Sequence, residues 1–453
     1  MIGGGFSGMA SAARLAKLGH QVTLFERAER LGGALGQLEV QGWSFDTGPT
    51  HTLLPAVIRD LFRKSGRPLE READLVPLEV VREHRFADGS ALQLTGGSRA
   101  AQKVAFDRLS PGLGTAWVQH VDPYSGVWES LRRNFFERPW NADLADPEAV
   151  RLLTERARLS DRLAANLPDP RARLVAGHPH VRDGHDLRKV PAWAGVVSYL
   201  EQNFGAWTVP GGIGVLGEVM ARRVRTRKVE VHTSTPVTDV VLRRGRVVAV
   251  RTRDGEAEAD AVVCAVDPSG LPSLRSARSP AGGSPRHLLT RRPTPAPVPD
   301  LLHLGLVGDG VLDEQFGPDL PGELVLHGED RSPDLVLRPG GSAPSDLPGA
   351  RAVTVHSRGV PADQVLDLLA SRGLDLRPQV EVQVARSGAE LTRIWGGSPL
   401  GAQWDGRRTV ATRPGPRTTV AGLYAAGAHT NPGAGLPFTG LSAWLVAQSI
   451  GPA

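Results

Sequence analysis

The sequence opens with three glycines, Gly3, Gly5 and Gly8, in the spacing Gly-x-Gly-x-x-Gly. A helical pattern of apolar residues follows and stops at Gly19, after which residues 20–26 read as a short β-strand. Glycines between a strand and a helix allow a tight turn and close packing of the helix on the strand. The first 26 residues therefore predict a β-α-β unit and a parallel sheet.

The first strand of this unit is short, because only Met1 and Ile2 precede Gly3. Strands usually have about five or six residues. We therefore expect the coding region to begin upstream, with apolar β-strand residues before Met1.

The glycine turn also predicts a binding site for a pyrophosphate. Backbone N–H groups and the positive end of the helix dipole favour negative charge at the start of the helix. Glu26 ends the next strand, near the spacing at which a carboxylate accepts hydrogen bonds from an adenosine ribose. We predict dinucleotide binding rather than a purely structural turn, through Gly3, Gly5, Phe6, Ser7, Gly8 and Glu26.

Composition excludes several classes of protein. The single cysteine, Cys264, excludes a disulfide framework and a cysteine-based zinc or iron–sulfur site. The net charge is only +5, with Arg scattered among acidic residues, so no nucleic-acid partner is indicated. No apolar run approaches the roughly 18 to 20 residues that span a bilayer. We expect a cytoplasmic protein, and peripheral contact with the inner membrane surface stays open.

Turn residues and periodicity predict the remaining elements. The expected elements are helices at 55–66, 117–135 (broken at Pro123) and 146–167, a hairpin at 79–94, a β-meander of strands 237–242, 247–252 and 259–266, and a linker or flap at 271–300. The aromatic stripe from Trp117 to Phe135 is interpreted as core rather than as a ligand pocket.

Three blocks in order along the chain resemble one family. Residues 27–33 (RAERLGG) and 46–49 (DTGP) resemble the FAD-binding N-terminus of phytoene (carotenoid) desaturases and their flavin amine oxidase relatives, with Ala34 where that family has arginine. Residues 207–214 (WTVPGGIG) resemble its xPxGGxG turn, and residues 422–437 resemble its C-terminal glycine-rich segment. Together the blocks span nearly the whole chain.

The resemblance implies FAD as cofactor and an α/β fold. A Rossmann-like, glutathione-reductase-like FAD-binding domain would be discontinuous, built from 1–55, 205–270 and 400–453. A mixed sheet-plus-helix substrate domain would take 56–204 and 271–399. Beyond the first glycines, the resemblance implies FAD contacts from Arg27, Gly32, Gly33, Thr47, Pro49, Val237, Gly427, Ala428, Gly435, Leu436 and Pro437.

The activity implied is desaturation, in which a hydride passes from a long, apolar isoprenoid or carotenoid-like substrate to flavin N5. An amine oxidase-like enzyme, a saturase or an isomerase on the same fold is the alternative. Two further alternatives are a nicotinamide-only dehydrogenase and a non-catalytic binding protein with a degenerate flavin site. Oligomeric state cannot be read from the sequence.

No catalytic residue stands out. His429 and Asn431, beside the last glycine block, are the candidates for a direct role, although His429 is first interpreted as a loop residue. Ser398 does not fit the Gly-x-Ser-x-Gly turn of hydrolases.

Two other surface predictions concern polar segments. His178, His180 and His185 are interpreted as part of a solvated loop rather than a metal site. An apolar portal for docking on a membrane is expected near 271–300, flanked by Arg291 and Arg292.

Overall fold

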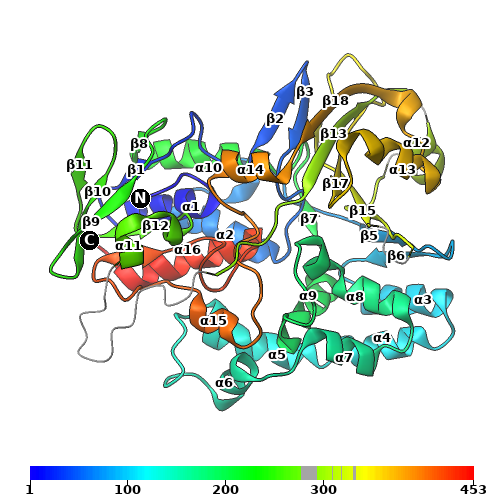
Figure 1. The fold of residues 1–453 in the computed structure, drawn as a ribbon, viewed down its shortest axis with the longest axis horizontal. Coiled ribbons are helices and arrows are strands. Elements are labelled where there is room, and N and C mark those ends of the chain that lie inside the picture. Colours follow the sequence, from blue (N-terminus) through cyan, green and yellow to red (C-terminus); the bar gives the residue numbers. More distant parts are fainter. Residues whose placement is uncertain (277–292, 309, 318, 330–332) are drawn as a thin grey trace.

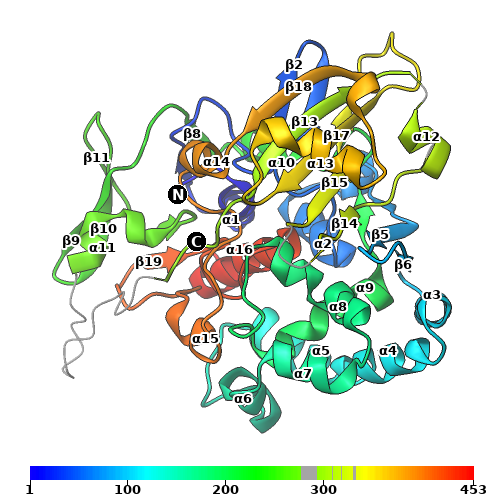
Figure 2. The ribbon, with the colours of Figure 1, turned by 45° about the vertical axis from the view of Figure 1, so that its right-hand side comes forward.

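The computed structural model describes residues 1–276, 293–308, 310–317, 319–329 and 333–453. Three parts meet in it (Figure 1): a parallel sheet with helices near both chain ends, a seven-stranded sheet, and a group of helices beside that sheet. Figure 2 shows the same parts from a second direction, with α16 (Leu436–Ile450) near the centre.

The parallel sheet is assembled from distant parts of the chain. β1 (Thr23–Phe25) pairs with β8 (Glu230–His232), and β12 (Val262–Cys264) pairs with β19 (Leu423–Ala425), both in parallel. Ile2 joins the two pairs, because it bridges the last residue of β1 on one side and of β12 on the other. The β-α-β unit and its discontinuous sheet are therefore confirmed, while the domain bounds stay a prediction.

Small residues bring the first helix close to this sheet. α1 (Phe6–Lys17) starts directly after the glycine turn. A Cβ added to Gly8 would lie 2.0 Å from the carbonyl oxygen of Gly3, so only glycine permits this approach. Around α1 pack three further helices, α2 (Pro55–Ser65), α10 (Val215–Thr226) and α16.

The β-meander is confirmed in kind but not in its third strand. β9 (Asp239–Arg243), β10 (Arg246–Arg251) and β11 (Glu256–Glu258) form it. The prediction of 259–266 as its third strand is wrong, because pairing resumes directly after the tight turn at Gly255 and the following β12 belongs to the parallel sheet.

The seven-stranded sheet has the order β18-β13-β17-β15-β14-β5-β6. β13 (Asp300–Leu306) shows how its two faces differ, because side chains alternate along a strand. Leu302, Leu304 and Leu306 belong to an apolar cluster that includes residues of α13 (Val365–Ser371). The opposite face of the strand lines a cavity described below. The other strands are β5 (Val80–Arg85), β6 (Ala91–Thr95), β14 (Leu324–Leu326), β15 (Leu335–Pro339), β17 (Arg351–Ser357) and β18 (Val380–Arg386).

The helical part buries the aromatic stripe. Trp117, Trp128 and Phe135 lie in one apolar cluster and are almost fully buried, which confirms their interpretation as core. The break at Pro123 is confirmed, because it separates two helices. The helices are α3 (Arg99–Leu109), α4 (Leu113–Val121), α5 (Tyr124–Leu131), α6 (Pro147–Thr154), α7 (Leu159–Asn166), α8 (Pro170–Arg182) and α9 (Val196–Phe204), with a π-helical turn at Arg132–Phe136.

The prediction of one helix over 146–167 is wrong. The chain is extended between α6 and α7, where Arg158 forms an isolated bridge with Pro191 and the Leu159 N–H donates to Val190. Pairing with this distant segment replaces the helical hydrogen bonds. The helix at 55–66 and the hairpin at 79–94 are confirmed by α2 and by the β5–β6 pair.

Shorter elements complete the described chain. They are β2 (Gln37–Val40), β3 (Trp43–Asp46), β4 (Val76–Pro77), β7 (Trp207–Thr208), β16 (Gly341–Ser342), α11 (Pro272–Ser276), α12 (Val311–Phe316), α14 (Gly388–Trp395) and α15 (Arg408–Thr412), with 3-10 turns at Leu69–Arg71, Ala192–Gly195, Pro268–Gly270, Ala362–Gln364 and Arg377–Gln379. Most of the expected flap at 271–300, including Arg291 and Arg292, lies outside the described residues. Within the described ranges, no helix has the length and apolarity needed to span a bilayer.

Candidate functional site

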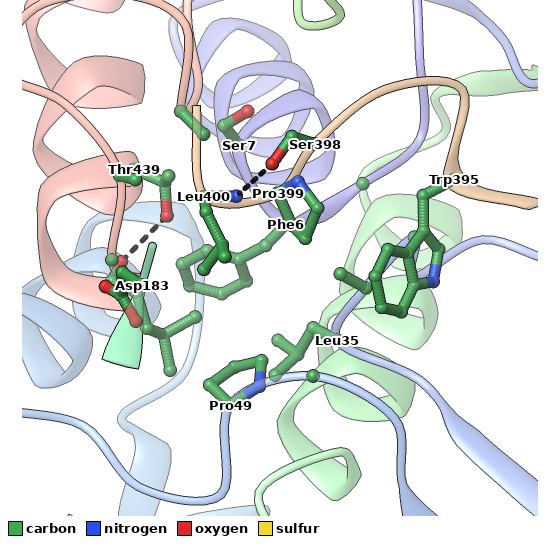
Figure 3. Close-up of a pocket in the computed structure, with 18 of the residues that line it drawn as sticks. Phe6, Ser7, Leu35, Pro49, Asp183, Trp395, Ser398, Pro399, Leu400 and Thr439 are labelled. Atoms are coloured by element: carbon green, nitrogen blue, oxygen red, sulfur yellow. Dashed lines mark hydrogen bonds between the residues drawn. The ribbon is translucent and has the colours of Figure 1, made fainter. Parts of the chain in front are cut away.

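One large cavity, of about 700 Å³, lies where the three parts meet. Figure 3 shows part of its wall, with Phe6 and Ser7 of α1 on one side and Asp183 and Pro49 on others. Its lining includes many of the residues expected to bind a cofactor: Gly3, Gly5, Phe6, Ser7, Glu26, Gly32, Gly33, Thr47, Pro49, Ala428, Gly435, Leu436 and Pro437. Segments separated by some 400 residues in sequence thus meet at one site, as the order of the three blocks predicts.

Two helix N-termini open into this cavity. α1 begins after Gly5, whose backbone is extended, and α16 begins after Gly435. Within the described chain, neither helix has a side-chain cap or an acidic residue in its first turn. A Cβ added to Gly5 would meet nothing within 4 Å, so the space in front of α1 is open. Both positive helix ends are therefore available to an anionic group.

Glu26 is fixed at the edge of the cavity by the backbone. One carboxylate oxygen accepts the N–H of Gly4 at 2.6 Å, and the other accepts the N–H of Ala28 at 2.8 Å. The side chain lies directly after β1 and is almost fully buried. Its position and remaining lone pairs suit hydrogen bonds from ribose hydroxyls.

Five of the predicted residues lie outside the lining. Gly8 packs against the first turn, and the Gly427 N–H donates to Ser442 Oγ at 2.9 Å. Arg27 donates to the backbone carbonyl of Ile394 at 2.5 Å. The others are Val237, which packs on the apolar cluster around the parallel sheet, and Asn431, whose amide donates to Val410 at 3.1 Å and to Arg413 at 3.2 Å.

An apolar wall faces the cavity beside the glycine turn. Leu35, Trp395, Pro399 and Leu400 are drawn around it in Figure 3. Phe136, Trp193, Trp404 and Phe438 add aromatic surface. Ser398 also lines this wall, where its Oγ accepts the N–H of Leu400 at 3.2 Å. Such a wall favours an apolar ligand next to the anion-binding helix ends.

The interpretation of three histidines as a solvated loop is wrong for His178 and His180, whereas His185 does lie in the loop after α8 and is half-buried. His178 and His180 belong to α8 and are almost fully buried. Burial lowers the pKa of His178, His180 and His185 to about 4. Glu323, a fully buried carboxylate whose Oε2 lies 3.0 Å from His178 Nε2, gives the buried His178 ring a polar partner and partly opposes the lowering of its pKa. His180 and His185 line the cavity as neutral imidazoles.

His429, a predicted catalytic candidate, lies in the cavity wall. Burial lowers its pKa, and the Asp267 charge partly opposes that shift. Its ring is therefore a neutral group beside the last glycine block.

Arg413 is a lining residue that the sequence did not indicate. It is 6% exposed and stacks over the Trp404 ring, with its Cζ atom 4.7 Å from the ring centroid. Its guanidinium donates to the carbonyls of Ala402 at 3.2 Å and Pro432 at 3.3 Å. Burial lowers its pKa to about 10, and no carboxylate in the described part of the chain opposes this shift. Arg413 is thus a buried cation in the cavity wall without an ion-pair partner among the described residues.

Comparison with known proteins settles the family. The model of a family described as flavin containing amine oxidoreductase matches residues 6–304. The chain belongs to this family.

Relatives match over nearly the full length. A hydroxyneurosporene desaturase of Rhodobacter capsulatus is 27% identical, over 99% of this chain and 97% of that protein. A carotenoid 3,4-desaturase of Haloarcula japonica is 25% identical over the same shares. The recognised resemblance to carotenoid desaturases is therefore confirmed.

Solved structures support the fold. A triple mutant of putrescine oxidase gives a TM-score of 0.69 at 18% identity, covering 99% of this chain and 97% of that one. A cyclohexylamine oxidase of Brevibacterium oxydans gives 0.66 at 15% identity, covering 99% and 98%. The expected α/β fold, with a Rossmann-like FAD-binding part and a mixed sheet-plus-helix part, is confirmed.

The protein is accordingly an FAD-dependent oxidoreductase. The cavity fits that cofactor, because α1 and α16 offer positive ends to the diphosphate and the flavin, and Glu26 suits the adenosine ribose. A nicotinamide-only enzyme would leave the C-terminal glycine block, which also lines the cavity, without a role.

Proposed function

We propose that the protein desaturates a long, apolar isoprenoid or carotenoid-like substrate. The observation that carries the proposal is one cavity that joins the predicted FAD contacts to an apolar and aromatic wall. The names of the full-length relatives, which are carotenoid desaturases, point in the same direction. FAD, when bound, supplies the hydride acceptor at flavin N5.

The chain's own residues would bind and orient the cofactor and the substrate. The N-terminus of α1, with Gly3 and Gly5, would hold the diphosphate, and Glu26 would hold the ribose. The N-terminus of α16 at Leu436 would face the flavin, where its positive end favours the negative charge of the reduced state. Gly32, Gly33, Thr47, Pro49, Ala428 and Pro437 would complete this contact.

Desaturation removes a proton as well as a hydride, and the chain offers an acceptor for that proton. His185 lines the cavity, and its buried Nδ1 has no hydrogen-bond partner among the described residues. Because burial lowers its pKa to about 4, its ring is neutral at pH 7 and has a free lone pair on one nitrogen. We assign the proton to this imidazole. The surrounding aromatic side chains exclude water from the reacting carbon.

Oxidation of an amine is the second candidate. It is favoured by a specific observation, since the carboxylates of Asp183 and Glu201 line the cavity and could attract an ammonium group. Both are already engaged, by Arg182 and Arg82 respectively. The apolar wall therefore supports the isoprenoid more strongly.

Flavin bleaching tests the proposal. The purified protein should carry FAD, seen in its visible spectrum and identified after denaturation. Under anaerobic conditions an acyclic polyene with saturated allylic positions should bleach the bound flavin, whereas putrescine and cyclohexylamine should not. Bleaching by an amine alone would overturn the proposal.

Substrate access suggests the location. A long isoprenoid partitions into lipid, so we propose a cytoplasmic protein that touches the inner membrane surface peripherally. Co-sedimentation with anionic liposomes at low salt is the expected result, and recovery of all protein in the supernatant would contradict it.

A further inference from the structure

The arginines that line the cavity differ in how their charge is compensated. Arg182 lies 2.9 Å from Asp183 and 2.6 Å from Glu323, so two carboxylates flank it. Arg338 lies 3.3 Å from Glu323. Arg413 is only 6% exposed, yet the described part of the chain pairs it with no carboxylate. Because burial of a charge without a counter-ion is unfavourable, this arginine needs a separate explanation.

The hydrogen bonds of Arg413 do not explain its charge. Its Nη1 donates to the carbonyl of Pro432 at 3.3 Å, and its Nη2 donates to the carbonyl of Ala402 at 3.2 Å. Its Nε is buried without a hydrogen-bond partner among the described residues. Since a neutral amide such as that of glutamine can also donate two hydrogen bonds, joining these two carbonyls does not require a cation.

Arg413 lies at the end of the cavity where α16 begins. A Cβ added to Gly433 would lie 2.6 Å from Arg413 Nη1, so the guanidinium packs directly against this glycine. Gly433 also lines the cavity, and it lies two residues before Gly435, after which α16 starts. The guanidinium charge and the uncapped positive end of α16 therefore lie at the same end of the cavity and reinforce one another.

The charge of Arg413 acts on other groups in the cavity wall. Burial is the main cause of the lowered pKa of His185 and His429, and the positive charge of Arg413 adds to it in both. The pKa of Arg413 itself is about 10, so the guanidinium is protonated at pH 7. Little water screens a buried charge, so it acts over a longer distance than an exposed one. Arg413 therefore favours negative charge in this part of the cavity without having to touch the group that carries it.

We propose that Arg413 stabilises the negative charge of reduced FAD through its electric field and thereby raises the reduction potential of the bound flavin. Transfer of a hydride to oxidised FAD adds two electrons and one proton, so the neutral isoalloxazine gains one negative charge. A fixed positive charge favours this reduced state over the oxidised one, in addition to the effect of the α16 end. The inference requires FAD as cofactor, but it does not depend on which substrate supplies the hydride.

The midpoint potential of the bound flavin tests the inference on the FAD-loaded, full-length protein. It is measured by anaerobic reduction beside a reference dye of known potential, with both followed in the visible spectrum. Arg413→Met removes the charge and keeps a long side chain. We expect the potential to fall by at least about 30 mV, which for a two-electron couple is a tenfold change in the reduction equilibrium.

A pair of conservative variants separates the charge of Arg413 from its hydrogen bonds. Arg413→Lys keeps the charge with fewer donors, whereas Arg413→Gln keeps two donors without the charge. The potential of the Lys variant should stay within about 10 mV of the unaltered protein, or roughly twofold in the equilibrium, and that of the Gln variant should fall as in Arg413→Met. Should Arg413→Met fail to fold or to hold FAD, this pair alone decides.

Arg386→Met is the matched control for loss of an arginine from the cavity wall. Arg386 lines the same cavity from β18, but its side chain is 35% exposed, so water screens its charge. Its replacement should shift the potential by less than about 10 mV. The visible spectrum of each variant checks that FAD remains bound.

Two results would overturn the inference. One is a potential in Arg413→Gln equal to that of the unaltered protein. The other is an equal fall in the Lys and Gln variants, which would assign Arg413 a purely structural role between the carbonyls of Ala402 and Pro432. Neither result bears on the proposed desaturation, because bleaching by a polyene tests that separately.

Discussion

Gly5 and Gly8 lie three residues apart in the same turn, yet their replacement by alanine should have opposite consequences. A Cβ on Gly8 would lie 2.0 Å from the Gly3 carbonyl oxygen, and real Cβ atoms essentially never come within 3.0 Å of another heavy atom. The helix would have to move by about 1 Å. Such overpacking costs typically 1–3 kcal/mol, occasionally more, and exceeds the gain of roughly 1 kcal/mol from replacing a helical glycine.

Gly8→Ala should therefore lower the stability of the FAD-free protein by about 2 kcal/mol. For a domain of roughly 150 to 250 residues this corresponds to a fall in Tm of about 4–8 °C. Gly5→Ala should leave the Tm of the FAD-free protein unchanged, because its backbone has φ −68° and ψ 178° and the new Cβ meets nothing within 4 Å. The added methyl group would instead occupy the space where the diphosphate approaches the backbone.

The assay compares the Gly5→Ala and Gly8→Ala variants in the FAD-free state and during titration with FAD. Differential scanning fluorimetry on FAD-free protein gives the Tm, and FAD titration gives the Kd. Gly5→Ala should weaken FAD binding at least about tenfold, or ~1.4 kcal/mol. Unchanged FAD affinity in Gly5→Ala would refute the placement of the diphosphate, and an unchanged Tm in Gly8→Ala would refute the packing argument.

Three further predictions follow from buried polar groups. Glu26→Gln should weaken FAD binding roughly 10- to 100-fold in the same titration while the fold persists, since the amide oxygen can still accept one of the two N–H groups; an unchanged Kd would argue against the ribose contact. Burial lowers the pKa of His120, His178, His180, His185 and His303 from 6.5 to about 4, so the unfolded chain binds protons that the folded chain does not. The free energy of unfolding should thus fall as pH drops below 6.5, by up to roughly 7 kcal/mol per pH unit. An equal free energy of unfolding in urea at pH 7 and pH 5 would contradict this. Arg82 and Glu201 form a buried ion pair, so Glu201→Gln should destabilise the protein by about 3–5 kcal/mol in urea unfolding, whereas replacing both residues by Leu and Met should recover most of that loss.

The sequence predicts best where a local motif fixes the backbone. The glycine turn before α1 and the break at Pro123 both depend on the residues at those positions, and both are found. The third strand of the meander and the helix over 146–167 were wrong because distant partners decide them: β19 pairs with β12, and Pro191 bridges Arg158. A local sequence pattern does not indicate which distant segment a strand or loop will pair with.

The residues of the candidate site likewise fall into those that a local motif predicts and those that depend on distant partners. Most predicted FAD contacts line the cavity, because glycine spacing and helix starts are readable along the chain. Arg413, His303 and His51 were not indicated, since a single polar residue has no periodicity. The burial of His178 depends on Glu323, which is 145 residues away. One signal was present: His303 interrupts an otherwise apolar run in β13, LLHLGL, on a strand buried on both faces.

The two ends of the cavity differ in their electrostatics. At the end lined by the glycine turn, α1 and α16 present uncapped positive ends without a carboxylate in either first turn, so this end favours an anion. At the sheet end, the Glu323 carboxylate is paired with Arg182 and Arg338 and the His303 ring is neutral at pH 7, so this end offers an anion no unpaired positive charge.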